Sequence, residues 1–474
     1  MVFSSIVFLL YFLPLFLITY FLVDKKYKNL VILFFSIAFY SWGAPKFIFV
    51  ILGTTFIDFH LVKWMSATES ENRRKVLLAL SVSVNLGLLL YFKYSNFFID
   101  NVNSLLGLLG GGEIKWTKLL LPIGISFYTF ETITYVVDVY RKIHKPLKNF
   151  WDYQLYIILF PKLIAGPIVR YHDLADQITD RSHNENNENR LTGFYRFVIG
   201  LSKKVIIANH MGLLADTIFV QDYATMDSYT AWIGILAYTF QIYFDFSGYS
   251  DMAIGLAKMI GFKFPENFNN PYTSRSITEF WRRWHITLGA WMRNYLYIPL
   301  GGNRVDSNLR KYANLWIVFL ASGLWHGASW NFVIWGAYHG FFLVIERMFL
   351  SKFYGKLGAF LPMIITFFVV VIGWVFFRIE HFNDALIYIK TLFSFRNMAS
   401  IPIDSEFYTY FVLAIFFSFF TVLKRGDIIQ KQVYEMPYNN FKHIILSFAV
   451  TVLFILSVSS ITTFSFNPFI YFRF

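Results

Sequence analysis

Long apolar runs separated by short charged loops recur along the whole chain. A helix needs about 20 apolar residues to cross a bilayer, and most of these runs approach that length. Such runs lie at 5–23, 29–43, 47–64, 76–92, 119–139, 151–169, 192–214, 229–246, 361–377, 407–423 and 443–460. Because backbone exposed to lipid must satisfy its own hydrogen bonds, the pattern predicts an all-α polytopic membrane protein with about ten or more transmembrane helices.

The composition and the placement of charge support a membrane protein. Hydrophobic residues make up 56% of the chain and charged residues only 15%, which is too apolar for a soluble protein of this size. The net charge of +13 does not indicate nucleic acid, because the basic residues fall in short loops such as 66–75, 141–148 and 424–431. Such loops face the cytoplasm, so we expect a multi-pass membrane protein with both termini outside.

The chain reads as one membrane domain over residues 1–474. The first 23 residues lack a basic start and a small-residue cleavage site, so they predict a first span and no cleaved signal. There is no fixed-period repeat and no polar region long enough for a soluble domain. Cysteine is absent from the sequence, which excludes disulfides, thiolate zinc sites and a cysteine nucleophile.

The apolar segment 313–345 contains two histidines, His326 and His339, and no Asp, Glu, Lys or Arg. A single helix of this length would span about 50 Å, against about 30 Å of hydrocarbon. Helix-breaking glycines, a serine and an asparagine surround His326, so we expect a hairpin of two short helices meeting there. Irregular backbone at membrane depth is tolerated only inside protein or beside a cavity, which predicts that His326 lies at the bottom of a pocket.

For other polar residues near apolar runs, the sequence predicts structural roles or leaves several roles open. His339 is expected to be a structural histidine that donates one hydrogen bond, and Glu131 and Lys162 are expected to be structural. Asp245 and Asp251 flank the sequence S-G-Y-S and are candidates to orient a histidine or to cap a helix.

A second histidine, His285, closes the sequence F-W-R-R-W-H near a predicted cytoplasmic face. Trp281, Trp284, His285 and Leu288 share one face of a helix by their spacing, while Arg282 points elsewhere.

Four motifs resemble those of the membrane-bound O-acyltransferases, and within them the alginate O-acetyltransferase branch. They are F-D-F-S-G-Y-S-D-M-A-I-G-L-A (244–257), F-P-E-N-F-N-N-P-Y (264–272), F-W-R-R-W-H-I-T-L-G-A-W-M-R-N-Y-L-Y-I-P-L-G-G-N-R (280–304) and S-G-L-W-H-G-A-S-W-N-F-V-I-W-G-A-Y-H-G (322–340). These core motifs cover 244–340, and P-I-G-I-S-F-Y-T-F (122–130) and F-P-K-L-I-A-G-P-I-V-R (160–170) extend the resemblance along nearly the whole chain. Asn294 departs from the branch, which usually has Asp there.

The resemblance implies transfer of acetyl from cytoplasmic acetyl-CoA toward a polysaccharide outside the membrane, with broken helices around a central pocket or tunnel. It implies that His326 is catalytic and that His285 is the second, cytoplasmic histidine. Histidine suits this chemistry because its pKa lies near the working pH of a general base. The thioester is already activated, so neither a metal nor a tightly bound cofactor is expected. Trp325 and Asn331 are supporting candidates.

Three arginines, Arg275, Arg282 and Arg283, are candidates to bind the phosphates of coenzyme A. Ordinary positive-inside topology explains them equally well.

The C-terminal residues 464–474 form an aromatic tail on the predicted external side, with Tyr471 as its only hydroxyl after Ser465. The resemblance suggests that Tyr471 accepts the acetyl group and passes it outward; an interfacial aromatic belt is the simpler reading.

The chain has no serine-nucleophile domain of its own. We therefore expect a separate extracytoplasmic SGNH or esterase-like transferase as partner. Alginate, peptidoglycan and other exopolysaccharides all fit as acceptors.

Two other functions remain open from the sequence. D-alanyl transfer to teichoic acid would use the same fold. A proton-coupled transporter would also explain buried ionisable residues and broken helices, although the chain shows no symmetric halves.

Overall fold

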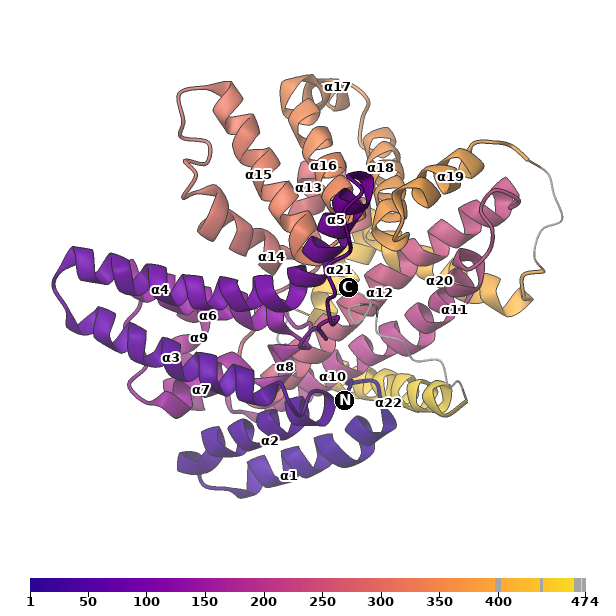
Figure 1. Ribbon diagram of the computed structural model, residues 1–474. Helices are drawn as coiled ribbons and strands as arrows, with labels where there is room; N and C mark the ends of the chain where they lie inside the picture. Colours follow the sequence, from indigo (N-terminus) through magenta and orange to yellow (C-terminus); the bar gives the residue numbers. More distant parts are fainter. Residues whose placement is uncertain (397–401, 435–437, 464–469, 471–474) are drawn as a thin grey trace. The chain divides into compact units, whose positions relative to one another are not determined.

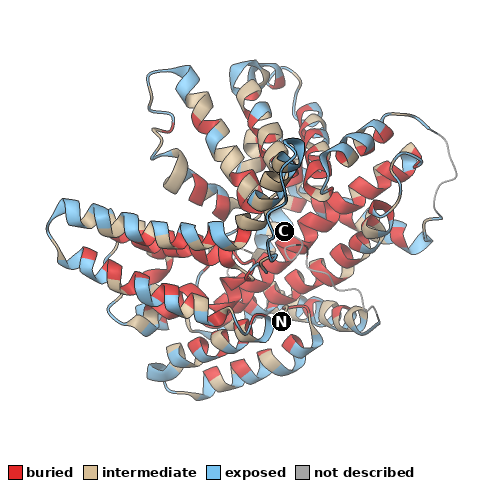
Figure 2. Ribbon diagram, viewed as in Figure 1, coloured by how far each residue is buried: buried red, intermediate tan, exposed pale blue. Residues whose placement is uncertain are grey.

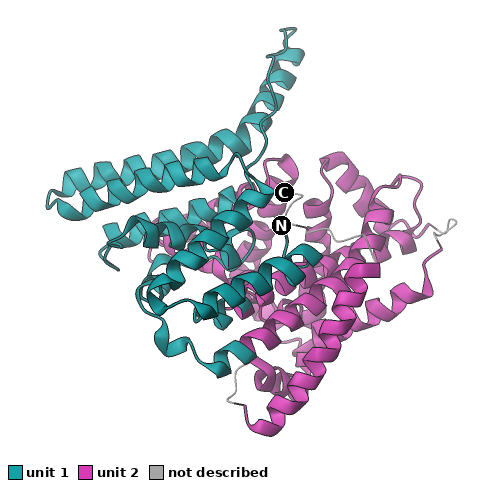
Figure 3. Ribbon diagram, turned by 90° about the horizontal axis from the view of Figure 1, so that it is seen from below, with its two compact units in different colours: residues 1–191, 256–265 teal, residues 192–255, 266–474 magenta. Residues whose placement is uncertain are grey.

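The computed structural model describes residues 1–396, 402–434, 438–463 and 470. Every regular element in these residues is a helix (Figure 1), which confirms the all-α class. Within the described ranges, seven helical stretches are long and apolar enough to cross a membrane, while the full number of crossings stays a prediction. The chain divides into two compact units, 1–191 with 256–265 (unit 1) and 192–255 with 266–474 (unit 2), shown in Figure 3. The prediction of a single domain is not tested by this division.

Unit 1 is built mainly from pairs of neighbouring helices. Its α-helices are α1 (Leu13–Leu22), α2 (Lys28–Gly43), α3 (Ile48–Ala67), α4 (Glu71–Leu89), α5 (Ser95–Leu108), α6 (Ile125–Tyr140), α7 (Phe150–Ile158), α8 (Phe160–Leu163) and α9 (Tyr171–Thr179). The first predicted spans therefore correspond to helices. Two later ones do not match a single helix.

The predicted spans 119–139 and 151–169 are interrupted by proline and glycine. Helix α6 begins only at Ile125, because Gly124 before it has the left-handed φ of 76° and a Cβ there would lie 2.8 Å from the Leu163 carbonyl oxygen. The stretch 151–169 breaks into α7 and α8 at Leu159, where Pro161 starts the second helix. Hydropathy alone predicted two continuous runs and missed both breaks.

Unit 2 contains most of the motif residues. Its α-helices are most of α10 (Asn187–Ser202) and of α12 (Ser228–Met259), together with α11 (Asn209–Phe219), α13 (Ile277–Arg283), α14 (Ile286–Trp291), α15 (Asn308–His326), α16 (Trp330–Ile345), α17 (Ser351–Tyr354), α18 (Phe360–Arg378), α19 (Phe382–Leu392), α20 (Ser405–Phe419), α21 (Lys424–Tyr434) and α22 (Asn440–Thr463). Residues Lys203–Ala208 (η5) form a π-helical turn after α10.

Helices α10 and α12 approach each other through glycines spaced seven residues apart. A Cβ on Gly200 would lie 2.5 Å from the Gly248 carbonyl oxygen, and a Cβ on Gly255 would lie 2.5 Å from that of Gly193. Small residues permit such contact between helix backbones, which is how many membrane helices associate. This contact helps to make α12 the central, largely buried helix of unit 2 (Figure 2).

Other helices of unit 2 carry large apolar side chains on their surface. Only 11% of the apolar window of α22 is buried, and it exposes Ile444, Phe448 and Ile455. A soluble protein rarely exposes so much apolar surface, whereas lipid covers it at no cost. This surface supports a multi-pass membrane protein.

Candidate active site

The hairpin predicted around His326 is present. Helix α15 ends at His326, Gly327 follows in an extended conformation, and Ser329 precedes the first residue of α16. The helices are longer than expected. Residues Trp330–Tyr354 form a continuous helical stretch of 25 residues, long enough to cross a membrane.

Glycines allow α15 and α16 to cross almost backbone to backbone. A Cβ on Gly323 would lie 2.2 Å from the Phe332 carbonyl oxygen, and one on Gly336 would lie 2.3 Å from the Phe319 carbonyl oxygen. Real Cβ atoms do not approach that closely, so larger residues would force the helices apart. The crossing fixes the end of α15, and with it His326.

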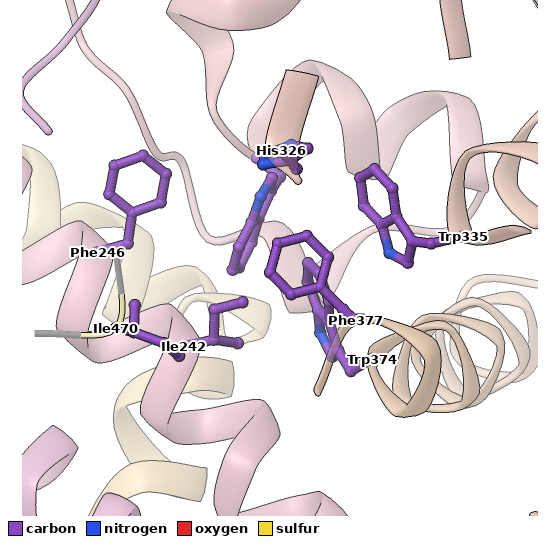
Figure 4. A pocket seen from close by; sticks show the side chains of 8 residues that line it. Ile242, Phe246, His326, Trp335, Trp374, Phe377 and Ile470 are labelled. Atoms are coloured by element: carbon purple, nitrogen blue, oxygen red, sulfur yellow. The ribbon is translucent and has the colours of Figure 1, made fainter. Parts of the chain in front are cut away.

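His326 lies in an apolar, aromatic pocket (Figure 4). Its ring makes edge contacts with Trp325, Trp335 and Phe377, at centroid distances of 4.8, 5.1 and 5.2 Å. The side chain is buried, with 8% of its surface exposed. The other residues lining the pocket are Ile242, Phe246, Trp284, Trp374 and Ile470. The prediction that His326 lines a pocket is confirmed within unit 2.

His285 lies in a strained and fully enclosed position. It precedes α14 with φ 46° and ψ 53°, a left-handed conformation that is uncommon outside glycine. Its Nδ1 is 3.0 Å from Asn267 Oδ1. Its Nε2 has no hydrogen-bond partner among the described residues.

The surroundings of Asn267 identify the tautomer of His285. The backbone N–H of Thr287 can only donate, and it donates to Asn267 Oδ1 at 3.4 Å. The Thr287 hydroxyl donates to the same oxygen at 2.9 Å, and Asn267 Nδ2 donates to the Ser250 hydroxyl. The atom facing His285 is therefore an acceptor, so His285 Nδ1 carries the hydrogen and neutral Nε2 keeps a lone pair.

Burial lowers the pKa of His285 to about 3. The residue lies outside the candidate spans. An imidazolium in this enclosed site would be poorly solvated, so the ring stays neutral at ordinary pH. His285 can therefore accept a proton or a hydrogen bond at Nε2 over the physiological range.

Two aromatic side chains connect the histidines. The Phe246 ring packs against His285 at 4.7 Å and also lines the pocket of His326. Trp325 lies 6.1 Å from the His285 ring and 4.8 Å from the His326 ring. The structure thus places aromatic side chains between the two imidazoles, and the catalytic roles of His285 and His326 stay predictions.

Asp245 contacts a cation and a distant backbone amide. Its Oδ1 is 2.9 Å from Lys204 Nζ, and its Oδ2 accepts the N–H of Ile470 at 2.8 Å. All three residues are almost completely buried. Asp245 therefore adjoins the pocket without contacting either histidine in any hydrogen bond of the described chain.

The second aspartate, Asp251, belongs to an ion cluster on the same helix. Its oxygens contact Arg196 at 2.8 Å and Lys203 at 2.6 Å, and Arg196 also pairs with Glu266. The carboxylate thus joins the π-helical end of α10 to α12. Neither a histidine nor a helix cap appears among its contacts in the described part of the chain.

Asn331 lies in the first turn of α16. It is buried and donates from Nδ2 to the carbonyl oxygen of Ile379, just beyond α18. It positions the hairpin and does not line the pocket.

The three candidate arginines do not line the pocket. Arg283 pairs with Glu279 at 2.6 Å, which accounts for its charge within α13. The side chains of Arg275 and Arg282 are exposed and form no ion pair with any described residue. Binding of donor phosphates by these arginines stays a prediction.

Tyr471 and most of the aromatic tail lie outside the described residues. The described residue before it, Ile470, lines the pocket of His326. The proposed relay through Tyr471 therefore stays a prediction.

Three residues expected to be structural are buried away from the pocket lining. His339 is enclosed by Trp281, Trp335 and Tyr338, but neither ring nitrogen has a hydrogen-bond partner in the described chain. The single hydrogen bond expected for it is therefore not present. In unit 1, Glu131 and Lys162 form an ion pair that is almost fully buried.

Three residues near the histidines were not predicted from the sequence: Asn267, Lys204 and Ile470. For Asn267 a signal existed, since the run E-N-F-N-N-P-Y places three asparagines and a proline beside a histidine motif. Lys204 lies in the middle of the predicted span 192–214, where a charged residue at membrane depth was itself a signal. Ile470 has no polar side chain to attract notice.

Comparisons with known proteins identify the family of this chain. The sequence profile of the membrane-bound O-acyltransferase family matches residues 141–379, which include both histidines. A "probable alginate O-acetylase AlgI" of Pseudomonas aeruginosa is 45% identical over 88% of this chain and 81% of its own. A protein of the same name from Azotobacter vinelandii is 41% identical over the full length of both chains. The peptidoglycan O-acetyltransferase of Helicobacter pylori is 36% identical over 86% of this chain and 82% of its own. The chain belongs to the membrane-bound O-acyltransferase family.

Proposed function

We propose that this protein is an O-acetyltransferase of the bacterial inner membrane that moves acetyl from cytoplasmic acetyl-CoA toward a polysaccharide of the cell envelope. The observation that carries the proposal is the pocket at the break between α15 and α16, where buried His326 faces apolar and aromatic walls. The relatives named as O-acetylases and O-acetyltransferases support the acetyl group and the acceptor class.

Transfer of acetyl from a thioester to a hydroxyl needs a general base and a site from which water is excluded. A hydroxyl oxygen attacks the thioester carbonyl while His326 takes its proton; the C–S bond breaks, and coenzyme A leaves as a thiol with that proton. A C–O ester bond replaces the thioester, so no oxidant or metal is required. The aromatic walls exclude water, which otherwise would hydrolyse the thioester. His285, with a lone pair at Nε2, provides a second acceptor one aromatic layer away.

The hydroxyl that first accepts acetyl is proposed to be that of Tyr471. Ile470, directly before it in the chain, lines the pocket, which supports access of the tail to His326. A partner transferase of the SGNH or esterase type then moves acetyl from the tyrosine to the polymer outside the membrane. This arrangement requires an external C-terminus. Mass spectrometry after incubation with labelled acetyl-CoA tests the relay, and continued turnover without acetyl on Tyr471 would exclude it.

Purified protein in nanodiscs tests the central proposal. The wild type should release coenzyme A from acetyl-CoA, and His326→Ala should reduce the rate by at least about 100-fold, within the range of general-base catalysis. His381→Ala is a matched control, because His381 is an exposed histidine of the same unit. Activity of His326→Ala equal to that control would remove the enzymatic role of His326.

Three further measurements test the alternative functions and identify the acceptor. Activity with a D-alanyl thioester carrier, and none with acetyl-CoA, would favour D-alanyl transfer to teichoic acid. Proton-coupled solute uptake into vesicles without thioester cleavage would favour a transporter. Ester-linked acetate measured in alginate, peptidoglycan and other envelope polymers of a deletion strain identifies the acceptor.

A further inference from the structure

The buried pair Lys204–Asp245 has a third partner that a simple ion pair does not require. Lys204 lies in η5 and Asp245 in α12, and their contact alone would join these two elements. The second carboxylate oxygen, however, accepts the backbone N–H of Ile470, which is 225 positions further along the chain. The pair thus binds a residue from the C-terminal tail.

The physical chemistry of this contact favours a binding site for main chain. A buried carboxylate needs a counter-charge on one side and hydrogen-bond donors for its remaining lone pairs. Lys204 supplies the first, and the Ile470 amide supplies the second. Hydrogen bonds between a backbone N–H and a carboxylate are about twice as strong as neutral ones. The contact is made with the main chain, so it holds Ile470 whatever side chain that position carries.

The same contact determines where the Ile470 side chain goes. Ile242, Asp245 and Phe246 lie on one face of α12 by their spacing of three and four residues. Ile242 and Phe246 line the pocket of His326, and Ile470 lines it beside them (Figure 4). A tail held at Asp245 therefore presents Ile470 to the pocket that the proposed function assigns to acetyl transfer.

We infer that Asp245, neutralised by Lys204, is the docking residue for the chain's own C-terminal segment, and that it holds the main chain of Ile470 at the His326 pocket. The inference rests on the proposed function for its purpose, since the docked segment leads directly to Tyr471. The docking itself is a structural claim that can be tested without turnover.

Disulfide trapping in the full-length protein provides the test, because the natural chain has no cysteine. Ile242→Cys with Ile470→Cys should form an intramolecular disulfide under mild oxidation, detected by mass spectrometry of linked peptides. Adding Asp245→Leu with Lys204→Met removes the docking carboxylate and leaves no buried charge unpaired, so the fold should survive. We expect the cross-linking rate to fall about tenfold, as for loss of one hydrogen bond to a charged group.

The control changes a neighbouring carboxylate on the same helix. Asp251→Asn disturbs the contacts with Arg196 and Lys203 but touches no described tail residue, so the cross-link should form at the normal rate. Gel filtration and thermal midpoints confirm that each variant is folded. No cross-link in the starting pair, or an unchanged rate after removal of Asp245 and Lys204, would overturn the inference.

The proposed function has a separate readout. Coenzyme A release by the wild-type protein tests acetyl transfer, whereas the cross-link tests docking. Failure of release with a cross-link that depends on Asp245 would remove the function and retain the docking site. Normal release of coenzyme A with a cross-link that is independent of Asp245 would retain the function and remove the docking site.

Discussion

Replacing Asn267 by aspartate should change the pH dependence of the reaction and little else. Aspartate has the same shape, and its oxygens can still accept from His285 Nδ1 and from Thr287. The oxygen that replaces Nδ2 can accept from the Ser250 hydroxyl, which rotates freely. The substitution therefore keeps the hydrogen bonds and adds a negative charge 3.0 Å from the imidazole.

The size of the effect follows from the environment of His285. Burial alone puts its pKa at about 3. An adjacent opposite charge favours the imidazolium by about one to three pKa units, which places the pKa between about 4 and 6. At the upper limit, about 90% of His285 would be protonated at pH 5, and Nε2 would have lost its lone pair. Activity at pH 5 should then be about tenfold below the plateau at pH 8, while the wild type should be almost unaffected by this group.

Coenzyme A release measured by chromatography between about pH 4.5 and 9 gives the profile. Asn270→Asp is the matched control, because it adds the same charge to the same loop and the Asn270 side chain hydrogen-bonds to Asn269 and Gln430 instead of His285. An acid limb that moves equally in both variants would refute the use of His285 Nε2 as an acceptor.

Three further predictions concern folding. Gly336→Ala places a Cβ 2.3 Å from a backbone oxygen of α15, so we expect the free energy of unfolding to fall by about 1–3 kcal/mol. The thermal midpoint in detergent should be lower than that of wild type, and an unchanged midpoint would contradict the close crossing. Glu131→Gln leaves buried Lys162 without its counter-charge and should lower the free energy of unfolding by about 3–5 kcal/mol. The added change Lys162→Met should restore most of this stability, and equal stability of the single variant and wild type would argue against a charged pair. The hydrogen bond with Asp138 raises the pKa of His172. The contribution of this pair to stability is therefore fully present below the ordinary value of about 6.5 and is lost as pH rises through the raised pKa. The stability difference between wild type and His172→Gln should be larger at pH 6 than at pH 9, and the opposite order would reject the pair.

The break at His326 could be predicted from sequence because its causes are local. The segment was too long for one span, and glycines, a serine and an asparagine surrounded the histidine. The break at Leu159 was missed although Pro161 follows closely, since an apolar run does not itself reveal where its helix ends.

The partners of polar residues could not be predicted in the same way. Asp245 and Lys204 lie on different elements, and Asn267 meets His285 only after the intervening helix has folded. Such pairs depend on which helix faces meet, and hydropathy carries no information about that. The two histidines were found because their motifs are distinctive; the residues that orient them were not.

The close crossing of α15 and α16 fixes the position of His326 independently of the side chains that shape the rest of the pocket. Backbone contact at Gly323 and Gly336 sets the position of His326, while the opposite wall consists of side chains from α12, α18 and the tail. A substitution at Ile242, which lines the pocket without a ring contact to His326, can therefore enlarge or reduce the space in the pocket without displacing the imidazole. Redesign of the pocket for a longer acyl donor should therefore begin with the Ile242 side chain and leave the two glycines unchanged.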